Sequence, residues 1–406
     1  MLYHVYDIQR AMLTSMGHMA DVGAQMLTSM TGPIEYFGGG PILSSALEVF
    51  AHAAAPRSKP AFNLPTTEVD GKTVSIIEER PVEKPFGDLL HFRKEGISGQ
   101  PPLLIVAPMS GHYATLLRGT VERMLPQHDV YITDWADAKL VPLSDGSFDL
   151  DDYVDYLIDF LHHIGPGAHM LAVCQPSVPS FAAAALMNAT KHPATPRTLT
   201  MMGGPIDTRE APTTVNTMAT QRPHDWFVHN VIARVPAYYP GGGRKVYPGF
   251  MQLAGFMSMN LGDHMDSHWN MFKHLVVGDG ESAEATKAFY DEYRAVCDMT
   301  AEFYLQTVDV VFQTHALPKG EFMHRGMLID PGAITQTALL AVEGERDDIS
   351  GLGQTKAALK LATNLADDKK KYLMAKGVGH YGIFNGSKWR TQIAPVLEEW
   401  IATHSV

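Results

Sequence analysis

The feature that most constrains the fold is a buried strand that ends on a cysteine. Residues 169–173 form a short apolar run, and Cys174 follows it directly, before a turn with two prolines and an alanine-rich helix. A nucleophile on a sharp turn between a strand and a helix is exposed at the top of a sheet, where a substrate can reach it. Free cysteines are also common core residues, and Cys297, in a helical stretch without such a turn, is interpreted as one. The context of Cys174 instead predicts the nucleophile of an acyl-transfer enzyme.

Two later strand ends supply the partners that such a cysteine needs. Residues 338–342 form an apolar run that opens into an acidic loop, where Asp347 is the candidate acid. Asp348 could exchange roles with it, and either residue could instead cap a helix. Residues 371–375 are typical of another strand, and the glycine-rich loop that follows carries His380. The order nucleophile, acid, histidine is that of the α/β-hydrolase fold, so the sequence predicts a triad of Cys174, Asp347 and His380.

The predicted chemistry assigns a role to each group. A thiol with a pKa of ~8.5 is weakly ionised at neutral pH, so it needs an imidazole or a helix N-terminus beside it. His380 supplies the imidazole, and Asp347 orients it. The oxyanion needs backbone N–H donors, which we assign to Gln175 and to Met109 or Ser110, after the strand run 103–107. This mechanism needs no metal and no cofactor.

Other residues near these loops have alternative interpretations. Ser110 could be mistaken for a nucleophile and His112 for a base, but their loop is better explained as the wall of the oxyanion hole. His112, Trp226 and Tyr381 are the candidates for contacts with the substrate.

The chain divides into four predicted segments. Residues 1–85 are a methionine-rich lead-in with helices from Leu2 to Met30 and from Ile42 to Ala54, followed by a hairpin. Its first helix either packs on the core or presents a surface to an apolar body or another subunit. Residues 86–208 alternate strand and helix, which predicts a mostly parallel sheet flanked by helices. Residues 209–336 are a mainly helical cap rich in aromatic residues and methionine, and residues 337–406 complete the hydrolase core. Most cap aromatics form its own core, and a minority line an apolar cleft over Cys174.

Composition narrows the classes of partner. The net charge is −12 without a block of lysine or arginine, which argues against nucleic acid. Two cysteines in 406 residues rule out a disulfide framework and suit a reducing compartment. We find no secretory signal and no run of the ~18 apolar residues of a membrane span. The sequence therefore predicts a soluble cytoplasmic protein without a membrane span, and it leaves a homo-oligomer open.

The chain resembles the intracellular poly(3-hydroxybutyrate) depolymerases, a family related to the polyhydroxyalkanoate synthases. The resemblance runs from the first residues to about Thr403. It rests on the strings at residues 107–118, 131–135, 173–176, 200–207, 246–250, 289–293, 342–344, 347–351 and 379–384.

This resemblance implies an α/β-hydrolase that uses Cys174, Asp347 and His380. Its substrate would be the amorphous polyester inside the cell, cleaved to 3-hydroxybutyrate or short oligomers at the granule surface. The glycines that usually lie two residues either side of the nucleophile are Ala172 and Pro176 here, and the family shares the proline. The alternatives are thiolysis with CoA as acyl acceptor, a polyester synthase, and a granule-binding protein without activity.

Overall fold

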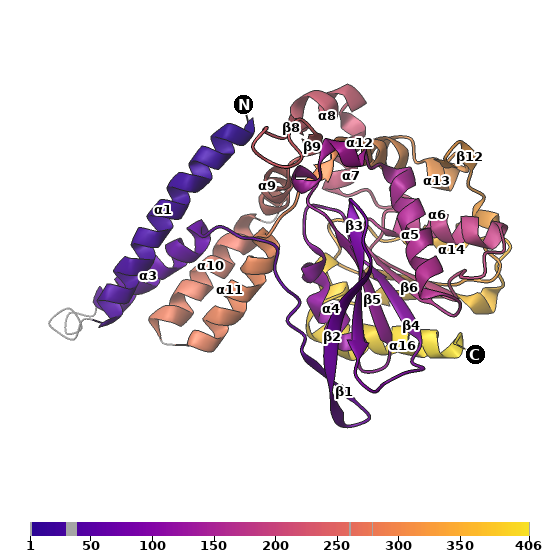
Figure 1. Cartoon of the computed structure of the whole chain (residues 1–406), viewed down its shortest axis with the longest axis horizontal. Helices are drawn as coiled ribbons and strands as arrows, with labels where there is room; N and C mark the ends of the chain where they lie inside the picture. The colour runs from indigo at the N-terminus through magenta and orange to yellow at the C-terminus, as the bar shows by residue number, and fades with distance from the viewer. Residues whose placement is uncertain (1, 30–38, 260, 278, 406) are drawn as a thin grey trace.

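The computed structural model describes residues 2–29, 39–259, 261–277 and 279–405. Its centre is a nine-stranded sheet (Figure 1). In spatial order the strands are β1 (Thr66–Val69), β2 (Lys72–Val82), β3 (Gly87–Lys94), β5 (Asp129–Trp135), β4 (Pro102–Val106), β6 (His169–Val173), β7 (Thr198–Met202), β13 (Ala338–Gly344) and β14 (Lys370–Ala375).

The six strands from β5 to β14 run parallel, whereas β1, β2, β3 and β5 pair in antiparallel fashion. Every residue of β6, β7 and β13 is buried, as expected for parallel strands covered on both faces. The predicted strands at 103–107, 169–173, 338–342 and 371–375 are therefore confirmed to within two residues at each end. A mostly parallel sheet in this order, with a strand that turns sharply into a helix after β6, is the α/β-hydrolase fold.

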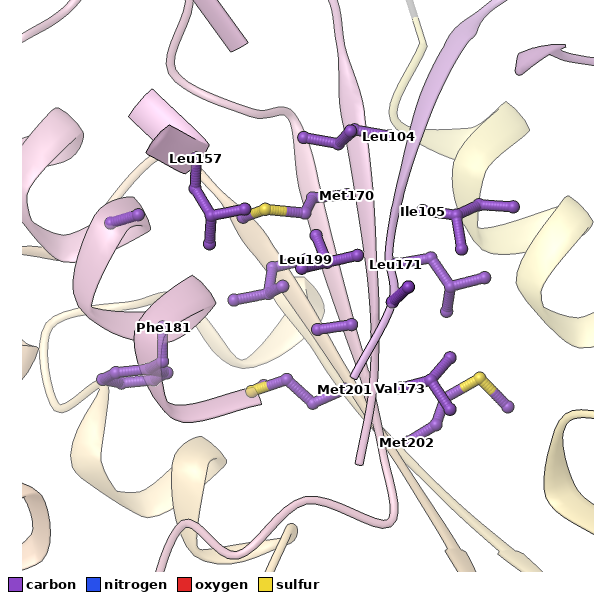
Figure 2. Packing of buried hydrophobic residues seen from close by; sticks show 14 of the residues in the cluster. Leu104, Ile105, Leu157, Met170, Leu171, Val173, Phe181, Leu199, Met201 and Met202 are labelled. Atoms are coloured by element: carbon purple, nitrogen blue, oxygen red, sulfur yellow. The ribbon is translucent and has the colours of Figure 1, made fainter. Parts of the chain in front are cut away.

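Helices cover both faces of the sheet. Alternate side chains of each strand point to opposite sides, so Met170 lies on the side of Leu157 and Phe181 while Leu171 lies on the other side (Figure 2). Leu157 belongs to α5 (Leu150–Ile164), and Phe181 to α6 (Ser177–Ala189). The remaining flanking helices are α4 (Arg118–Met124), α14 (Ala357–Leu361), α15 (Gly386–Lys388) and α16 (Ala394–Thr403).

A long, mainly helical segment is inserted between β7 and β13, which are direct neighbours in the sheet. The insertion is mainly helical, as the sequence predicted for a cap. The exact boundaries of the four predicted segments stay a prediction. The helices of the insertion are α7 (Thr214–Gln221), α8 (His224–Asn230), α9 (Gly249–Met259), α10 (Leu261–Val276), α11 (Gly280–Arg294), α12 (Ala301–Thr307) and α13 (Ala316–Lys319). Its strands are β8 (Ala233–Arg234), β9 (Lys245–Tyr247), β10 (Met299–Thr300), β11 (Met323–His324) and β12 (Met327–Leu328).

Two N-terminal helices, α1 (Leu2–Ser29) and α3 (Gly39–Ala54), lie with α10 and α11 beside the α/β body (Figure 1). Met30, the predicted end of the first helix, lies outside the described residues. The two helices approach closely at Gly17, where a Cβ atom would be 2.9 Å from that of Ala54. Within the described part of the chain, no helix is both long and apolar enough to cross a bilayer.

Candidate active site

Cys174 occupies a strained turn directly after β6. Its backbone φ is +67°, a conformation that costs a non-glycine residue energy and that the α/β-hydrolase nucleophile turn requires. The turn is held by two hydrogen bonds: the Cys174 N–H donates to the Met202 carbonyl at 2.7 Å, and the Ser177 N–H donates to the Cys174 carbonyl at 3.0 Å. A Cβ atom at Gly204 would lie 2.0 Å from the Ser177 hydroxyl. Only glycine therefore fits beside the turn, and the Cys174 side chain stays partly exposed.

His380 and Asp347 form a buried pair next to this turn. The Nδ1 atom of His380 lies 2.7 Å from Oδ2 of Asp347, and the two side chains are 5% and 0% exposed. The other carboxylate oxygen of Asp347 accepts the N–H groups of Ile349 at 2.9 Å and Ser350 at 2.8 Å. Because both oxygens are engaged, the carboxylate is fixed and Nδ1 of His380 is the donor. Asp347 contacts the histidine, so the structure favours it over Asp348 as the orienting acid.

The imidazole also hydrogen-bonds to the side chain of Cys174. Burial alone would lower the pKa of His380, but the charges of Cys174 and Asp347 and their hydrogen bonds raise it well above its ordinary value. A Cβ atom at Gly203 would lie 3.1 Å from Cε1 of His380 and 3.2 Å from Oδ2 of Asp347. The structure thus brings together the three residues that the sequence singled out, and a glycine leaves room for the pair.

The loop after β4 lies against the nucleophile turn. The Met109 N–H donates to Oε1 of Gln175 at 3.3 Å, while the backbone N–H of Gln175 has no hydrogen-bond partner among the described residues. Ser110 is partly exposed in the same loop. The Ala107 carbonyl at the base of this loop is fixed by Trp135 Nε1 at 2.8 Å and the Tyr153 hydroxyl at 3.0 Å. One of the predicted oxyanion donors is therefore unbonded, and the other holds the Gln175 side chain.

The three candidates for substrate contact lie in different places. His112 is buried, and its Nε2 donates to the Tyr293 carbonyl at 3.1 Å; burial lowers its pKa to about 4, so it is neutral at pH 7. Tyr381 follows His380 in the chain, and its ring centroid is 5.9 Å from that of the histidine. Trp226 belongs to α8, where its ring contacts are Phe227 and Arg222. Tyr381 is thus beside the triad, and Trp226 is on the cap.

Sequence reasoning missed Glu343, the buried acid that organises the Asp347 loop. Its carboxylate accepts the N–H groups of Gly353 and Lys356, both at 2.9 Å, and the Tyr372 hydroxyl at 2.8 Å. The signal was present, because an acidic residue that directly follows the apolar run 338–342 and is buried with it needs internal donors. Sequence reasoning also missed the contact between the Gln175 side chain and the Met109 N–H. The spacing of these two residues in the sequence does not predict it.

The sequence matches the model of a known protein family. A family model described as the C-terminus of PHB de-polymerase matches residues 203–405. No curated protein matches the sequence.

The chain is also similar, at low identity, to several solved structures. An esterase from Thermogutta terrifontis is 13% identical with a TM-score of 0.44, over 87% of this chain and 100% of that one. A monoacylglycerol lipase from Paleococcus ferrophilus is 13% identical with a TM-score of 0.42, over 75% and 96%. The thioesterase domain from the curacin biosynthetic pathway is 10% identical with a TM-score of 0.44, over 81% and 99%.

Proposed function

The chain belongs to the poly(3-hydroxybutyrate) depolymerase family, whose model matches half of it, and from this premise we propose that it hydrolyses poly(3-hydroxybutyrate) through a Cys174, His380 and Asp347 triad. The family supports ester hydrolysis, and the products of the proposed reaction are 3-hydroxybutyrate and short oligomers. The observation that carries the proposal is the position of His380, which bonds to Asp347 on one side and Cys174 on the other.

The proposed reaction starts with the thiol. The Cys174 sulfur attacks an ester carbonyl carbon, and its proton passes to Nε2 of His380, which is the nitrogen that Asp347 leaves available. The carbonyl oxygen becomes an oxyanion, which the backbone N–H of Gln175 stabilises together with a donor of the 109–110 loop. For Met109 to serve as that donor, the Gln175 side chain must first release its N–H.

The second half of the reaction releases the acyl group. His380 returns its proton to the alkoxide that leaves, which breaks the ester bond and leaves a thioester on Cys174. Nε2 then takes a proton from water, and the hydroxide attacks the thioester carbonyl. The C–S bond breaks, the acid departs, and the imidazolium returns its proton to the Cys174 sulfur, which restores the thiol and the neutral histidine. The raised pKa of His380 favours the imidazolium that both halves require.

One experiment decides between this proposal and its alternatives. Wild-type, Cys174→Ala and Cys297→Ala proteins are incubated with amorphous poly(3-hydroxybutyrate) granules, with and without CoA. We expect free acid from the wild type and Cys297→Ala, and a loss of at least about 10³-fold in Cys174→Ala. Acyl-CoA formed only with CoA would indicate thiolysis, and CoA-dependent chain growth from acyl-CoA would indicate a synthase. Acid formation that is equal in Cys174→Ala would contradict the triad.

We further propose that α1 contacts the polymer surface in the cell, where the protein associates with polyester granules. A stripe of large apolar side chains on α1 is 46–67% exposed, and its three- and four-residue spacing puts it on one face. Asp7, Arg10 and Asp21 lie off this face by the same spacing. An uncharged face suits a neutral polyester, whereas an anionic membrane would favour lysine and arginine. The stripe consists of Leu2, Val5, Ile8, Met12, Met16, Met19, Val22 and Met26.

The granule contact is tested with the double substitution Met12→Gln and Met19→Gln. Each glutamine buries less apolar area against the polymer than the methionine it replaces. We therefore expect the affinity for granules, measured by sedimentation, to fall about tenfold or more. Turnover of a soluble 3-hydroxybutyrate oligomer should not change. The matched control is Leu140→Gln with Leu143→Gln, which removes two exposed apolar side chains, 50% and 55% exposed, from outside α1. Equal loss in both double variants would contradict a specific role of α1.

A further inference from the structure

A cavity of about 450 Å³, referred to below as the arginine cavity, lies between the N-terminal end of α1, α9 and the segment after α11. None of the proposed triad residues lines it. Four cationic side chains do, although the whole protein is acidic. They are Arg10, Arg57, Lys139 and Arg294.

Two of these four charges have no carboxylate partner among the residues that the structure describes. Lys139 pairs with Asp137 at 2.8 Å, and Arg57 pairs with Asp291 at 2.7 Å. Arg10 and Arg294 form no ion pair with any residue in the described ranges. The cavity therefore holds two uncompensated guanidinium groups.

The arginines are crowded together. Nη2 of Arg10 and Nη1 of Arg57 donate to the same carbonyl oxygen, that of Ala55, at 3.2 Å and 2.6 Å. Burial lowers the pKa of Arg294, and the charges of Arg57 and Arg10 lower it further. Its Nη1 atom is buried and has no hydrogen-bond partner in the part of the chain that the structure describes. The positive charges of neighbouring arginines repel one another. The buried Nη1 donor of Arg294 lacks an acceptor, which costs further free energy.

The two acidic residues that line the cavity are engaged elsewhere. Asp7 accepts the hydroxyl groups of Tyr238 and Tyr239. Asp298 accepts the Gly249 N–H at 2.8 Å and the Tyr3 hydroxyl, and burial raises its pKa to about 7, which removes part of its negative charge. Neither acid therefore neutralises Arg10 or Arg294.

Another wall of the cavity is aromatic and aliphatic. The rings of Tyr6 and Phe250 are stacked with centroids 4.0 Å apart, and Leu253, Met257 and Val296 line the cavity with them. A ligand that fits this cavity has an anionic group, which contacts the arginines, and an apolar or aromatic part, which contacts the aromatic and aliphatic side chains.

We propose that this cavity binds a phosphorylated small molecule. Its phosphate group lies among Arg10, Arg57 and Arg294, and its organic part lies against Tyr6 and Phe250. Arginine clusters suit phosphate because each planar guanidinium can donate two parallel hydrogen bonds to its oxygens. The volume is within the range of small-molecule sites. The inference does not depend on the proposed hydrolysis.

The cavity is also connected to the loop beside Cys174. Val296, which lines it, pairs with His112 in an antiparallel bridge. The next residue, Cys297, donates its N–H to the Gly111 carbonyl at 2.8 Å. A ligand in the cavity therefore rests on the segment that supports the proposed oxyanion loop.

Calorimetric titration of the full chain with inorganic phosphate, ADP and CoA tests the proposal. We expect saturable binding of at least one of the three, weakened tenfold or more in Arg294→Gln and Arg10→Gln. The control is Arg222→Gln, because Arg222 is exposed and stacks on Trp226 away from the cavity. Thermal unfolding without ligand checks that the variants fold, and removal of one of the crowded charges should leave the melting temperature equal or higher.

The three titrants separate the sources of the phosphate. Tighter binding of CoA than of ADP would assign the site to a thiol-bearing acyl acceptor, and equal binding would assign it to a nucleotide. Cys174→Ala protein should bind as the wild type does, so failure of the proposed hydrolysis leaves this result intact. No saturable binding of any titrant, or equal affinity in both arginine variants and the control, would overturn the proposal.

Discussion

Cys297 and Gln175, the neighbour of Cys174, contact the same loop, yet the surroundings of the two cysteines differ in exposure and in hydrogen bonding. Cys174 is partly exposed on a strained turn, bonded to His380, and its neighbour Gln175 binds the Met109 N–H. Cys297 is 3% exposed, and its thiol lies 3.8 Å from the His112 carbonyl. Burial raises the pKa of the Cys297 thiol, so it stays protonated at neutral pH.

The residue type alone therefore does not determine how reactive a thiol is. A thiolate requires a nearby positive charge and a path to solvent, and only the region at the carboxyl end of the sheet offers both. The region around Cys297 instead joins the insertion to the core, through backbone bonds that any residue could make. The sequence-based interpretation of Cys297 as a core residue is confirmed by its burial.

The largest expected effect concerns the acid of the Cys174 region. Asp347→Asn keeps the size of the side chain but no longer fixes the tautomer of His380, so we expect kcat on the polyester to fall by about 10³- to 10⁴-fold. Steady-state rates of acid release measure it. Asp348→Asn is the matched control, because Asp347 is the residue that bonds to the histidine. Equal losses in the two variants would contradict a distinct role for Asp347, and a larger loss in Asp348→Asn would exchange their roles.

Thiol labelling sharpens the contrast between the cysteines directly. At pH 7 iodoacetamide should modify Cys174 at least about 100-fold faster than Cys297 in the native protein, because Cys174 is partly exposed and bonded to His380, whereas Cys297 is buried. Mass spectrometry of the two peptides gives the rates, and both should react alike in denaturant. His380→Gln should slow Cys174 and leave Cys297 unchanged. Comparable labelling rates of Cys174 and Cys297 in the native protein would contradict the proposed difference in their reactivity.

The Cys297 region should also respond to pH through its neighbour Asp298. Burial raises the pKa of Asp298 to about 7 from its ordinary 3.8, so between these values the folded state holds a proton that the unfolded state has released. Stability therefore decreases as pH rises from about 4 to 7. We expect Asp298→Asn, which cannot ionise, to gain roughly 2–3 kcal/mol relative to the wild type between pH 5 and pH 8.

Urea unfolding at the two pH values measures this change. Asp367→Asn, at an exposed position, is the control and should show little pH-dependent difference from the wild type. A difference between Asp298→Asn and the wild type that is the same at both pH values would contradict the shifted pKa.

The Cys174 region could be predicted from sequence because parallel strands end at one edge of a sheet. Cys174, Asp347 and His380 each follow an apolar strand, so their strand ends place them together before any contact is known. The Cys297 region lacks such a rule. The bond from Tyr3 to Asp298 joins residues almost 300 positions apart, and the arginines of the arginine cavity come from three separate segments. Such contacts depend on how helices pack, and residue spacing holds no signal for them.

The smallest expected effect comes from Cys297→Ala. The substitution keeps the backbone N–H that donates to the Gly111 carbonyl at 2.8 Å, so the loop keeps its support and turnover should stay within about twofold of the wild type. It removes a buried sulfur from a packed site, which costs about 1–2 kcal/mol in the free energy of unfolding. Equilibrium unfolding and acid release on the same preparation measure both. A tenfold loss of turnover without a loss of stability would mean that the thiol itself, and not only the backbone of this segment, acts on the loop beside Cys174.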